Sequence, residues 1–461
     1  MSETRVQRET TPTFLVAVLA LCAALVAFGI GLVAVTHTSK SDAFSAGLVA
    51  DTGVTDAKIE LADISISPKA ITVPKGKKIT LHVHNKGALE HDLRVNGTDG
   101  PKMLGHDATQ TITIGPFDTS TQAWCSVAGH KAAGMLLDIN VAGSAPTAGT
   151  ATTSSGFDAN DATIDFNKTT KADWKPFDPA LKPALGGTTH TVTLHAIEKV
   201  IEVAPGVHQL LWTFNGQVPG PILRGHIGDV FTVTLVNDGT IEHSVDFHAS
   251  KVAWNTQMRS IKPGESLVYQ YQANYAGIFM YHCGTAPALH HIGNGMYGAV
   301  IIDPPTLAPV DHEYALVQSE FYLGPEGQPG DLAKMQAVQP DAVVFNGYAN
   351  QYKDHPIRVE PNQRVRVWVL DAGPSENSAF HIVGTIFDTV FKEGSYLLQP
   401  DARRGGSQVL DLQPAQGGFV EFSLAQKGLY PIVTHKFANV GKGALGLFQA
   451  GNVPPTKMAG H

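Results

Sequence analysis

The chain contains three segments that end in related sequences, and this repetition constrains the fold more than any other feature. The related endings are AWCSVAGH at residues 123–130, FMYHC at residues 279–283 and GLYPIVTH at residues 428–435. Cys125 and Cys283 are 158 residues apart. His282 and His435 are 153 residues apart. Because these spacings are long and nearly equal, they indicate an internal repeat of one domain. Cysteine is present in only the first two copies.

Within the segments, short runs alternate between apolar and polar residues, which is the pattern of half-buried strands. Residues 79–84, 230–235 and 364–369 show the alternation clearly. The chain also holds 46 glycines and 28 prolines, spread between such runs, and long amphipathic patterns are hard to find. Many short strands separated by turns predict an all-β protein. A length of 461 residues leaves room for three β domains.

Composition also predicts where the domains begin and end. Residues 143–187 open with a low-complexity stretch of Gly, Ala, Ser and Thr, which predicts a flexible linker and lead-in. Pro304 and Pro305 mark a second boundary. We therefore predict β domains at residues 56–142, 188–305 and 306–461, and we call these ranges segments one, two and three.

Residues 1–55 carry one long apolar run. Residues 14–35 hold no charged side chain, and a helix of that length can cross a hydrocarbon core of about 30 Å. The run predicts a single transmembrane helix between a cytoplasmic tip and a tether, and a long cleaved signal peptide is the alternative. Arg5 and Arg8 precede the run, which predicts that the β domains lie on the extracytoplasmic side of the cell membrane.

The charge of the chain excludes one class of partner. The formal net charge is −8, only 16% of the residues are charged, and no basic block occurs. The chain therefore lacks the electrostatic footprint of a protein that binds nucleic acid. Three cysteines cannot form a disulfide framework. Twenty histidines, in contrast, are a generous supply of metal ligands.

Two sets of residues match the ligands of a blue (type 1) copper site, which uses two imidazoles, a thiolate and a weak thioether. The sets are His91, Cys125, His130 and Met135 in segment one, and His243, Cys283, His291 and Met296 in segment two. His290 competes with His291, but the step from His291 to Met296 equals the step from His130 to Met135 and favours His291. A core cysteine near unrelated histidines is the alternative for either set alone.

Segment two carries further histidines that this copper site does not use. Along an extended chain, neighbouring side chains point to opposite faces. His243 and His248 therefore face different sides, and Asp246 shares a side with His248. His282 and Cys283 diverge in the same way. The two can bind different metal ions, with a very short covalent path for an electron between them.

The third segment cannot build a blue site because it has no cysteine. His435 stands where His282 stands in the repeat, so it is the natural third imidazole beside His248 and His282. Three imidazoles without a thiolate leave an open position on a copper ion, as a catalytic metal site requires. Asp246 and His381 are candidate acid–base groups.

Over residues 188–450 the chain resembles the copper-containing nitrite reductases. The motifs that carry the resemblance are TFNGQVPGP (213–221), HSVDFHAS (243–250), MYHCGTAPALHHIGNGMYG (280–298), FHIVGTIFD (380–388) and THKFANVGKGALG (434–446). Segment one resembles a small blue-copper protein of the auracyanin or azurin kind. Together they imply three cupredoxin-like Greek-key β-barrel or sandwich domains in tandem after one transmembrane helix, with segment one as a fused N-terminal cupredoxin.

The resemblance implies a role for each candidate residue. His243, Cys283, His291 and Met296 would bind type 1 copper, and His248, His282 and His435 would bind type 2 copper. Asp246 and His381 match the catalytic pair of the family. Family members are homotrimers in which His435 and His381 would come from the neighbouring subunit. Val383 stands where the family often has a larger isoleucine over the substrate.

The implied reaction is the one-electron reduction of nitrite to nitric oxide and water. It would use two type 1 coppers and one type 2 copper per chain. The electrons would come from a donor protein, either a cytochrome or a cupredoxin.

Two other functions remain open. A laccase-like multicopper oxidase needs several His-x-His pairs and a histidine on both sides of the cysteine. Here Cys283 is followed by Gly284, and segments two and three contain no His-x-His sequence. An inactive electron carrier tethered at the surface is the other alternative, and the set of three histidines argues against it.

Overall fold

The computed structural model describes residues 54–62, 65–87, 89–96, 100–127, 130–131, 135–142, 161–171, 173–400 and 405–454. The predicted transmembrane run at 14–35 and the low-complexity stretch at 143–160 lie outside these residues. Among the residues that the structure describes, no helix is both long enough and apolar enough to cross a membrane.

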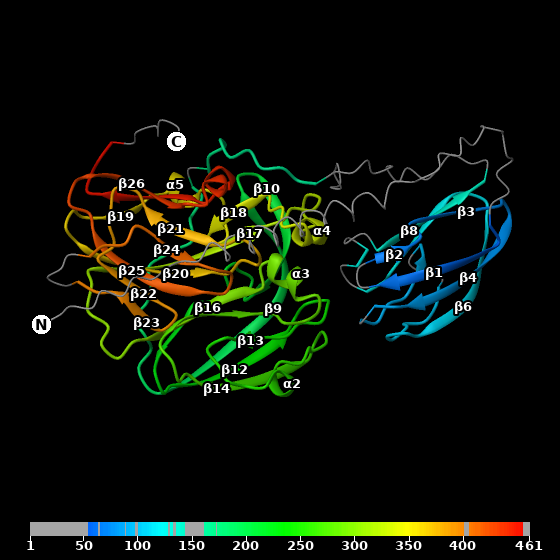
Figure 1. Cartoon of the computed structure of the whole chain (residues 1–461), viewed down its shortest axis with the longest axis horizontal. Coiled ribbons are helices and arrows are strands. Elements are labelled where there is room, and N and C mark those ends of the chain that lie inside the picture. Colours follow the sequence, from blue (N-terminus) through cyan, green and yellow to red (C-terminus); the bar gives the residue numbers. More distant parts are fainter. Residues whose placement is uncertain are drawn as a thin grey trace, which may run out of the picture. The chain divides into compact units, whose positions relative to one another are not determined.

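Strands are the main regular structure of each segment (Figure 1). Segment one has β1 (Asp56–Ala62), β2 (Ser65–Ser67), β3 (Ala70–Val73), β4 (Lys77–Asn85), β5 (Arg94–Val95), β6 (Thr109–Phe117), β7 (Thr121–Trp124) and β8 (Leu136–Val141). Segment two has β9 (Thr189–Ala204), β10 (Val207–Phe214), β11 (Leu223–His226), β12 (Val230–Asn237), β13 (Asp246–Phe247), β14 (Ser266–Gln272), β15 (Gly277–His282) and β16 (Tyr297–Asp303).

Segment three has β17 (His312–Phe321), β18 (Ala342–Phe345), β19 (Ile357–Val359), β20 (Arg364–Asp371), β21 (Ser378–Ile382), β22 (Thr389–Lys392), β23 (Ser395–Leu398), β24 (Leu410–Leu412), β25 (Gly417–Ser423), β26 (Gly428–Thr434) and β27 (Leu445–Ala450). The helices are short: α2 (Trp254–Gln257), α3 (Ala288–Gly293), α4 (Leu332–Gln336), α5 (Gln351–Asp354) and the 3₁₀ helix η1 (Phe437–Lys442). The prediction of an all-β protein is confirmed.

The three segments share one topology, as the related endings predict. Each segment forms two sheets. In segment one the strand orders are β2-β1-β4-β6 and β3-β8-β7-β5, and in segment two they are β10-β9-β12-β14 and β11-β16-β15-β13. In segment three they are β18-β17-β20-β25-β22-β23 and β19-β27-β26-β21-β24. In the first sheet of each segment, the second and third strands of the order are parallel. These pairs are β1/β4, β9/β12 and β17/β20. In every second sheet the first two strands are parallel, in the pairs β3/β8, β11/β16 and β19/β27.

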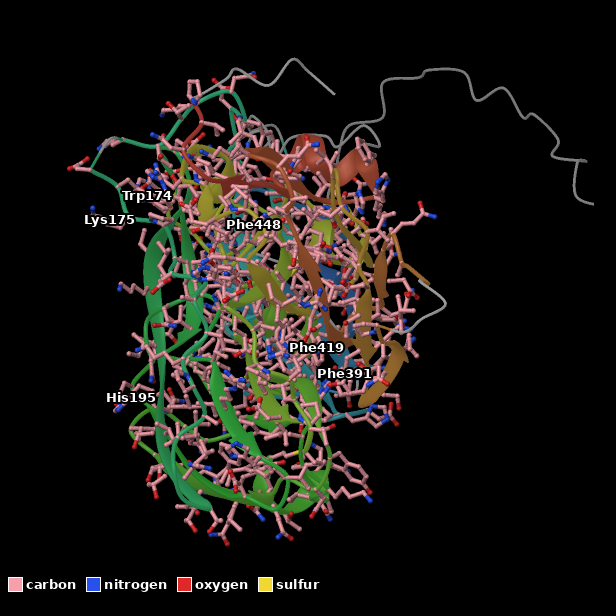
Figure 2. The ribbon with its side chains drawn as sticks, turned by 90° about the vertical axis from the view of Figure 1, so that its left-hand side faces the viewer. Trp174, Lys175, His195, Phe391, Phe419 and Phe448 are labelled. Carbon is pink, nitrogen blue, oxygen red and sulfur yellow. The ribbon has the colours of Figure 1, made fainter. Side chains whose placement is uncertain are left out.

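Alternating side chains fill the space between the paired sheets. In β12, Phe231, Val233 and Leu235 are buried while their neighbours are half-buried. Burying each such side chain stabilises the fold by about 1.5–3 kcal/mol. One apolar cluster includes residues of segments two and three, and in it Phe391 stacks on Phe419 with ring centroids 4.9 Å apart (Figure 2).

The end of the predicted linker packs against segment three. The Ala162 backbone N–H donates to the Gly324 carbonyl at 2.9 Å. Further along, the ring centroid of Trp174 lies 4.3 Å from that of Tyr348. The lead-in from residue 161 onward is therefore part of the folded structure.

Buried asparagines shape the loops that carry the first histidine of each predicted copper site. In segment two, Asn237 Nδ2 donates to the carbonyls of Ile241 and Ile261, both at 2.8 Å, and Gly239 N–H donates to Asn237 Oδ1 at 3.0 Å. His243 then forms a β-bridge with Ile261. The histidine is thus held by a loop whose polar groups are paired inside the protein.

Segment one builds the same loop. Asn85 Nδ2 donates to the carbonyls of Leu89 and Leu104, both at 2.7 Å, and Gly87 N–H donates to Asn85 Oδ1 at 3.0 Å. His91 forms its β-bridge with Leu104. The two loops have the common sequence N-x-G-x-x-E-H, at residues 85–91 and 237–243.

We expect Asn237→Ala to lower the free energy of unfolding by about 1–3 kcal/mol, the cost of leaving the Ile241 carbonyl without its donor. The Ile261 carbonyl keeps the His243 N–H at 3.2 Å. Urea unfolding of the metal-free protein measures this, and reaction of the Cys283 thiol with a thiol reagent reports on the loop. The exposed Asn274→Ala is the matched control and is expected to change little. Equal urea midpoints for the two variants would contradict the assigned role of Asn237.

Candidate metal centres

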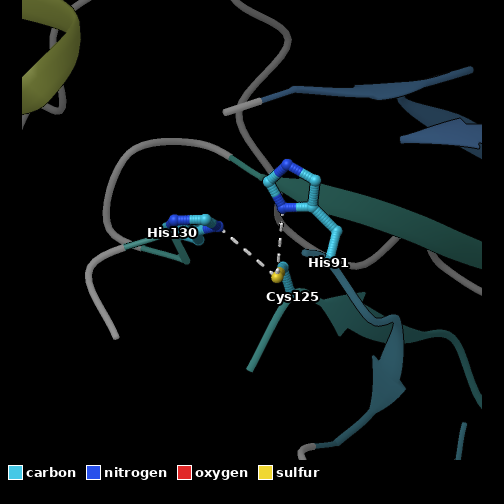
Figure 3. A group of neighbouring side chains, drawn as sticks. All are labelled: His91, Cys125 and His130. Carbon is cyan, nitrogen blue, oxygen red and sulfur yellow. Dashed lines mark hydrogen bonds between the residues drawn. The ribbon is translucent and has the colours of Figure 1, made fainter. Parts of the chain in front are cut away.

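The first predicted copper set is gathered in the interior of segment one. Cys125 follows β7 directly, and its Sγ lies 3.8 Å from His91 Nδ1 and 3.5 Å from His130 Nδ1. Both imidazoles point toward the sulfur (Figure 3). Met135 N–H donates to the His130 carbonyl at 2.9 Å, and Cys125 N–H donates to the Met135 carbonyl at 3.2 Å. All four side chains are buried. We call this group site one.

Segment two gathers the second set in the same way. Cys283 Sγ lies 3.9 Å from His243 Nδ1 and 3.3 Å from His291 Nδ1. The loop repeats the bonds of site one, since Met296 N–H donates to the His291 carbonyl at 3.1 Å and Cys283 N–H donates to the Met296 carbonyl at 3.1 Å. These four residues, also buried, form site two.

The neighbouring histidines of α3 have different surroundings. His291 lies beside the Cys283 sulfur, whereas His290 Nε2 donates to the Gly330 carbonyl at 3.0 Å. Burial lowers the pKa of His290 to about 4 and that of His291 to about 3. Both rings are therefore neutral at pH 7. Only His291 presents a nitrogen to the thiol.

The two sulfur atoms have different electrostatic surroundings. Burial raises the pKa of Cys125 to about 11, the backbone N–H groups of Asp92 and Val127 oppose the rise, and the charge of Asp92 adds to it. Burial also disfavours the Cys283 thiolate, but a hydrogen bond with His243 and the Ser244 N–H, 3.3 Å from Sγ, outweigh it and lower the pKa of Cys283. The negative charge of the thiolate is thus better stabilised at site two.

A third group lies where β13 meets β15. His248 Nε2 is 3.0 Å from His282 Nε2, and Asp246 Oδ2 is 3.8 Å from the same His282 nitrogen. His282 Nδ1–H donates to the Cys283 carbonyl at 2.9 Å, which leaves Nε2 as the nitrogen that can bind a metal ion. We call Asp246, His248 and His282 the histidine site. As predicted from the alternation of an extended chain, His282 and Cys283 belong to different groups.

His381 and His435 form a matching pair on segment three. Their ring centroids are 5.1 Å apart, compared with 5.0 Å for His248 and His282. His435 N–H donates to the Ala379 carbonyl at 2.7 Å, so β21 and β26 hold this pair much as β13 and β15 hold the other. His381 Nδ1–H donates to the Gln408 carbonyl at 2.5 Å and leaves its Nε2 available.

Within one chain, the histidine site does not include the pair on segment three. Among the described residues, the ligand atoms that lie within 4.8 Å of one another at this site belong to Asp246, His248 and His282 alone. Val383 follows β21, and its N–H donates to the Pro431 carbonyl at 2.8 Å. In the part of the chain that the structure describes, the pair on segment three thus stays separate from the histidine site.

Three residues that hold the sites were not predicted from the sequence. Glu198, on β9, places Oε1 3.3 Å from His243 Nε2 and accepts a hydrogen bond from Thr240 N–H at 2.9 Å. It lies 45 residues before His243, so no local pattern points to it. Asn85 and Asn237 could have been found, because the N-x-G-x-x-E-H motif occurs at both sites.

The residues present fit copper. Two imidazoles, a thiolate and a thioether are the ligands of a blue site, and sites one and two each supply this set. Imidazoles with a nearby carboxylate, as in the histidine site, suit a copper ion that keeps an open position.

The chain is similar to two protein families and to proteins of known name. The family model for multicopper oxidases matches residues 196–307, and the model for cupredoxin-like domains matches residues 25–122. The copper-containing nitrite reductase of Neisseria gonorrhoeae is 36% identical over 267 residues, which cover 55% of this chain and 67% of that protein.

Two solved structures extend the comparison. The copper nitrite reductase of Nitrosomonas europaea aligns with a TM-score of 0.53 and 34% identity, over 57% of this chain and 94% of that chain. A multicopper oxidase aligns with a TM-score of 0.51 and 26% identity, over 59% of this chain and 93% of that chain. The identity of 36% to a relative of which this chain covers 67% shows that the chain belongs to the copper-containing nitrite reductases, a family of oxidoreductases.

Proposed function

We propose that the chain reduces nitrite by one electron to nitric oxide and water, with uptake of two protons. Sites one and two would hold type 1 copper, and His248, His282 and His435 would hold type 2 copper. Copper bound in this way would supply one-electron chemistry and a positive centre for the nitrite anion. The observation that carries the proposal is the divergence of His282 and Cys283, which are adjacent in sequence but belong to different groups.

The two adjacent residues connect the groups by covalent bonds. A hydrogen bond from His282 Nδ1–H to the Cys283 carbonyl at 2.9 Å adds a second connection. The same bond fixes the orientation of the imidazole and keeps Nε2 directed at the histidine site. The chain thus provides a short and rigid path between the sulfur of site two and the imidazole of the histidine site.

Asp246 and His381 would hold the protons. Asp246 Oδ2 lies 3.8 Å from His282 Nε2, and its side chain is 29% exposed, so it can exchange protons with water. His381 keeps Nε2 free because Nδ1–H is bound to the Gln408 carbonyl. We assign both residues to protonation of the nitrite oxygen that leaves as water. Val383 would line the substrate pocket.

A second copy of the chain would complete the catalytic site. Among the residues that the structure describes, the histidine site gathers two imidazoles within one chain, while the pair of His381 and His435 presents two that site one and site two do not use. We propose a homotrimer in which this pair of one subunit faces the histidine site of the next. The resemblance to the nitrite reductase family supports this arrangement.

The remaining parts of the proposal concern the supply of electrons. We propose that segment one is a fused cupredoxin that receives electrons from a cytochrome or another cupredoxin and passes them to site two. We also propose that residues 14–35 anchor the protein in the cell membrane, with the catalytic segments on the extracytoplasmic side.

A laccase-like multicopper oxidase is the second candidate, favoured by the family model over residues 196–307 and by the aligned oxidase structure. Such an enzyme needs more histidines around its copper cluster than the described residues bring together at the histidine site. Oxygen consumption with a phenolic substrate distinguishes this function from nitrite reduction.

We expect His435→Ala to lower nitrite-dependent nitric oxide production by more than about 100-fold, because a metal ligand is lost. Both blue absorption bands are expected to remain. His312→Ala, a histidine of the same segment bound to Gln363, is the matched control. Full activity of His435→Ala would overturn the assignment of the third ligand.

Co-expression tests the shared site. A His435→Ala subunit still carries His248 and His282, and a His248→Ala/His282→Ala subunit still carries His435. We expect each variant alone to be inactive and mixed oligomers to recover part of the activity, because some interfaces then contain all three histidines. If mixed oligomers form and stay inactive, the shared site is wrong.

The two cysteines provide a matched pair. We expect Cys283→Ser to remove the blue band of site two and to slow nitrite reduction by at least about 100-fold. Cys125→Ser is expected to remove the other blue band and to leave reduction by a small artificial donor intact. Absorption and paramagnetic resonance spectra, together with nitric oxide production, measure both effects. Equal activity of the two variants with the artificial donor would contradict the proposed path.

A further inference from the structure

Sites one and two differ at a position that the repeat makes directly comparable. The residue after the first histidine is Asp92 at site one and Ser244 at site two. Both are buried, at 0% and 1% exposure. Both bind the residue that follows the cysteine, since Ser126 N–H donates to Asp92 Oδ1 at 2.6 Å and Gly284 N–H donates to Ser244 Oγ at 3.0 Å. The same structural task is performed by a carboxylate in one copy and a hydroxyl in the other.

The two side chains act differently on the sulfur atom. Ser244 Oγ lies 3.8 Å from Cys283 Sγ, within the distance for a weak hydrogen bond to sulfur. A carboxylate can only accept hydrogen bonds. Asp92 accepts one from Ser126 Oγ at 2.7 Å and one from Arg94 Nε at 2.6 Å, in addition to the Ser126 N–H. Three donors stabilise the ionised form and hold a negative charge beside the loop of Cys125.

We propose that Asp92 tunes site one by holding the reduction potential of its copper below the value that a serine would give at the same place. The proposal rests on the assignment of sites one and two as type 1 copper sites. Reduction adds negative charge to the metal–thiolate unit, so a nearby anion opposes it and a hydroxyl donor to sulfur favours it. A lower potential at site one favours the transfer of each electron toward site two.

Two other charged groups, Arg94 and Glu198, also influence the reduction potentials of these sites, and the test has to take them into account. Arg94 is paired with Asp92 and reduces the effect of the carboxylate without removing it, since its own side chain is 29% exposed. Glu198 contacts His243 at site two, on the ring nitrogen remote from the sulfur. Because Glu198 influences the absolute potential of site two, each site has to be compared with its own variants.

Reciprocal substitution in the full-length, copper-loaded chain tests the proposal. Asp92→Ser and Asp92→Asn are made in a Cys283→Ser background, where site one gives the blue band, and Ser244→Asp in a Cys125→Ser background, where site two gives it. The potential of the band is measured by spectroelectrochemistry without nitrite. We expect both Asp92 variants to raise the potential of site one and Ser244→Asp to lower that of site two. The expected shift is about tenfold in the redox equilibrium, or about 59 mV for one electron.

Asp107→Asn is the control, since it removes a carboxylate of the same segment whose side chain is 76% exposed. Its effect is expected to be small because exposed charges are screened. Asp92→Asn separates charge from shape and keeps the test decisive if Asp92→Ser does not bind copper. Unchanged potentials in Asp92→Asn and Ser244→Asp would overturn the proposal. The potentials are read without nitrite, so a failure of the proposed reaction and a failure of this inference are distinguishable.

Discussion

The divergence of two neighbouring side chains at the end of β15 is the constraint on which the chemistry of this protein depends. His282 is the last residue of the strand and pairs with Asp246 of β13, while Cys283 turns into the core toward His243 and His291. The hydrogen bond from His282 Nδ1–H to the Cys283 carbonyl fixes the orientation of the His282 imidazole. Ordinary strand geometry, in which successive residues face opposite sides, is therefore sufficient to place two candidate metal sites one residue apart.

Much of this arrangement could be predicted from the sequence. The period-two runs predicted the strands, and the related endings predicted the repeated topology. The sets His91/Cys125/His130 and His243/Cys283/His291 come together as the spacing indicated. Glu198 was missed because β9 reaches His243 only through the fold. The role of Asp92 was also missed, since its partners depend on how two loops meet. The partners of His435 in the proposed catalytic site come from a second copy in our proposal, so one chain does not display them. The predicted transmembrane run lies outside the described residues.

The three copies of the fold have diverged in a consistent way. Segments one and two keep the loop built on Asn85 and Asn237, and with it the buried thiol. Segment three keeps the strand order but has no cysteine, and it retains a histidine pair at the matching ends of β21 and β26. A copy of the fold can thus lack the thiol-bearing loop and still present a histidine pair at the ends of two neighbouring strands. The chemistry of the protein follows from which of these two features each copy retains.

The apolar cluster shared by segments two and three has a consequence for folding. Ile278 and Met280, on the strand that leads to Cys283, belong to the same cluster as Phe391 and Phe419. Elements that bury their side chains in one core lose this packing together, so these two segments are expected to unfold as a single cooperative unit. Damage to the packing of segment three therefore spreads to the ligands of site two, although no ligand of that site belongs to segment three.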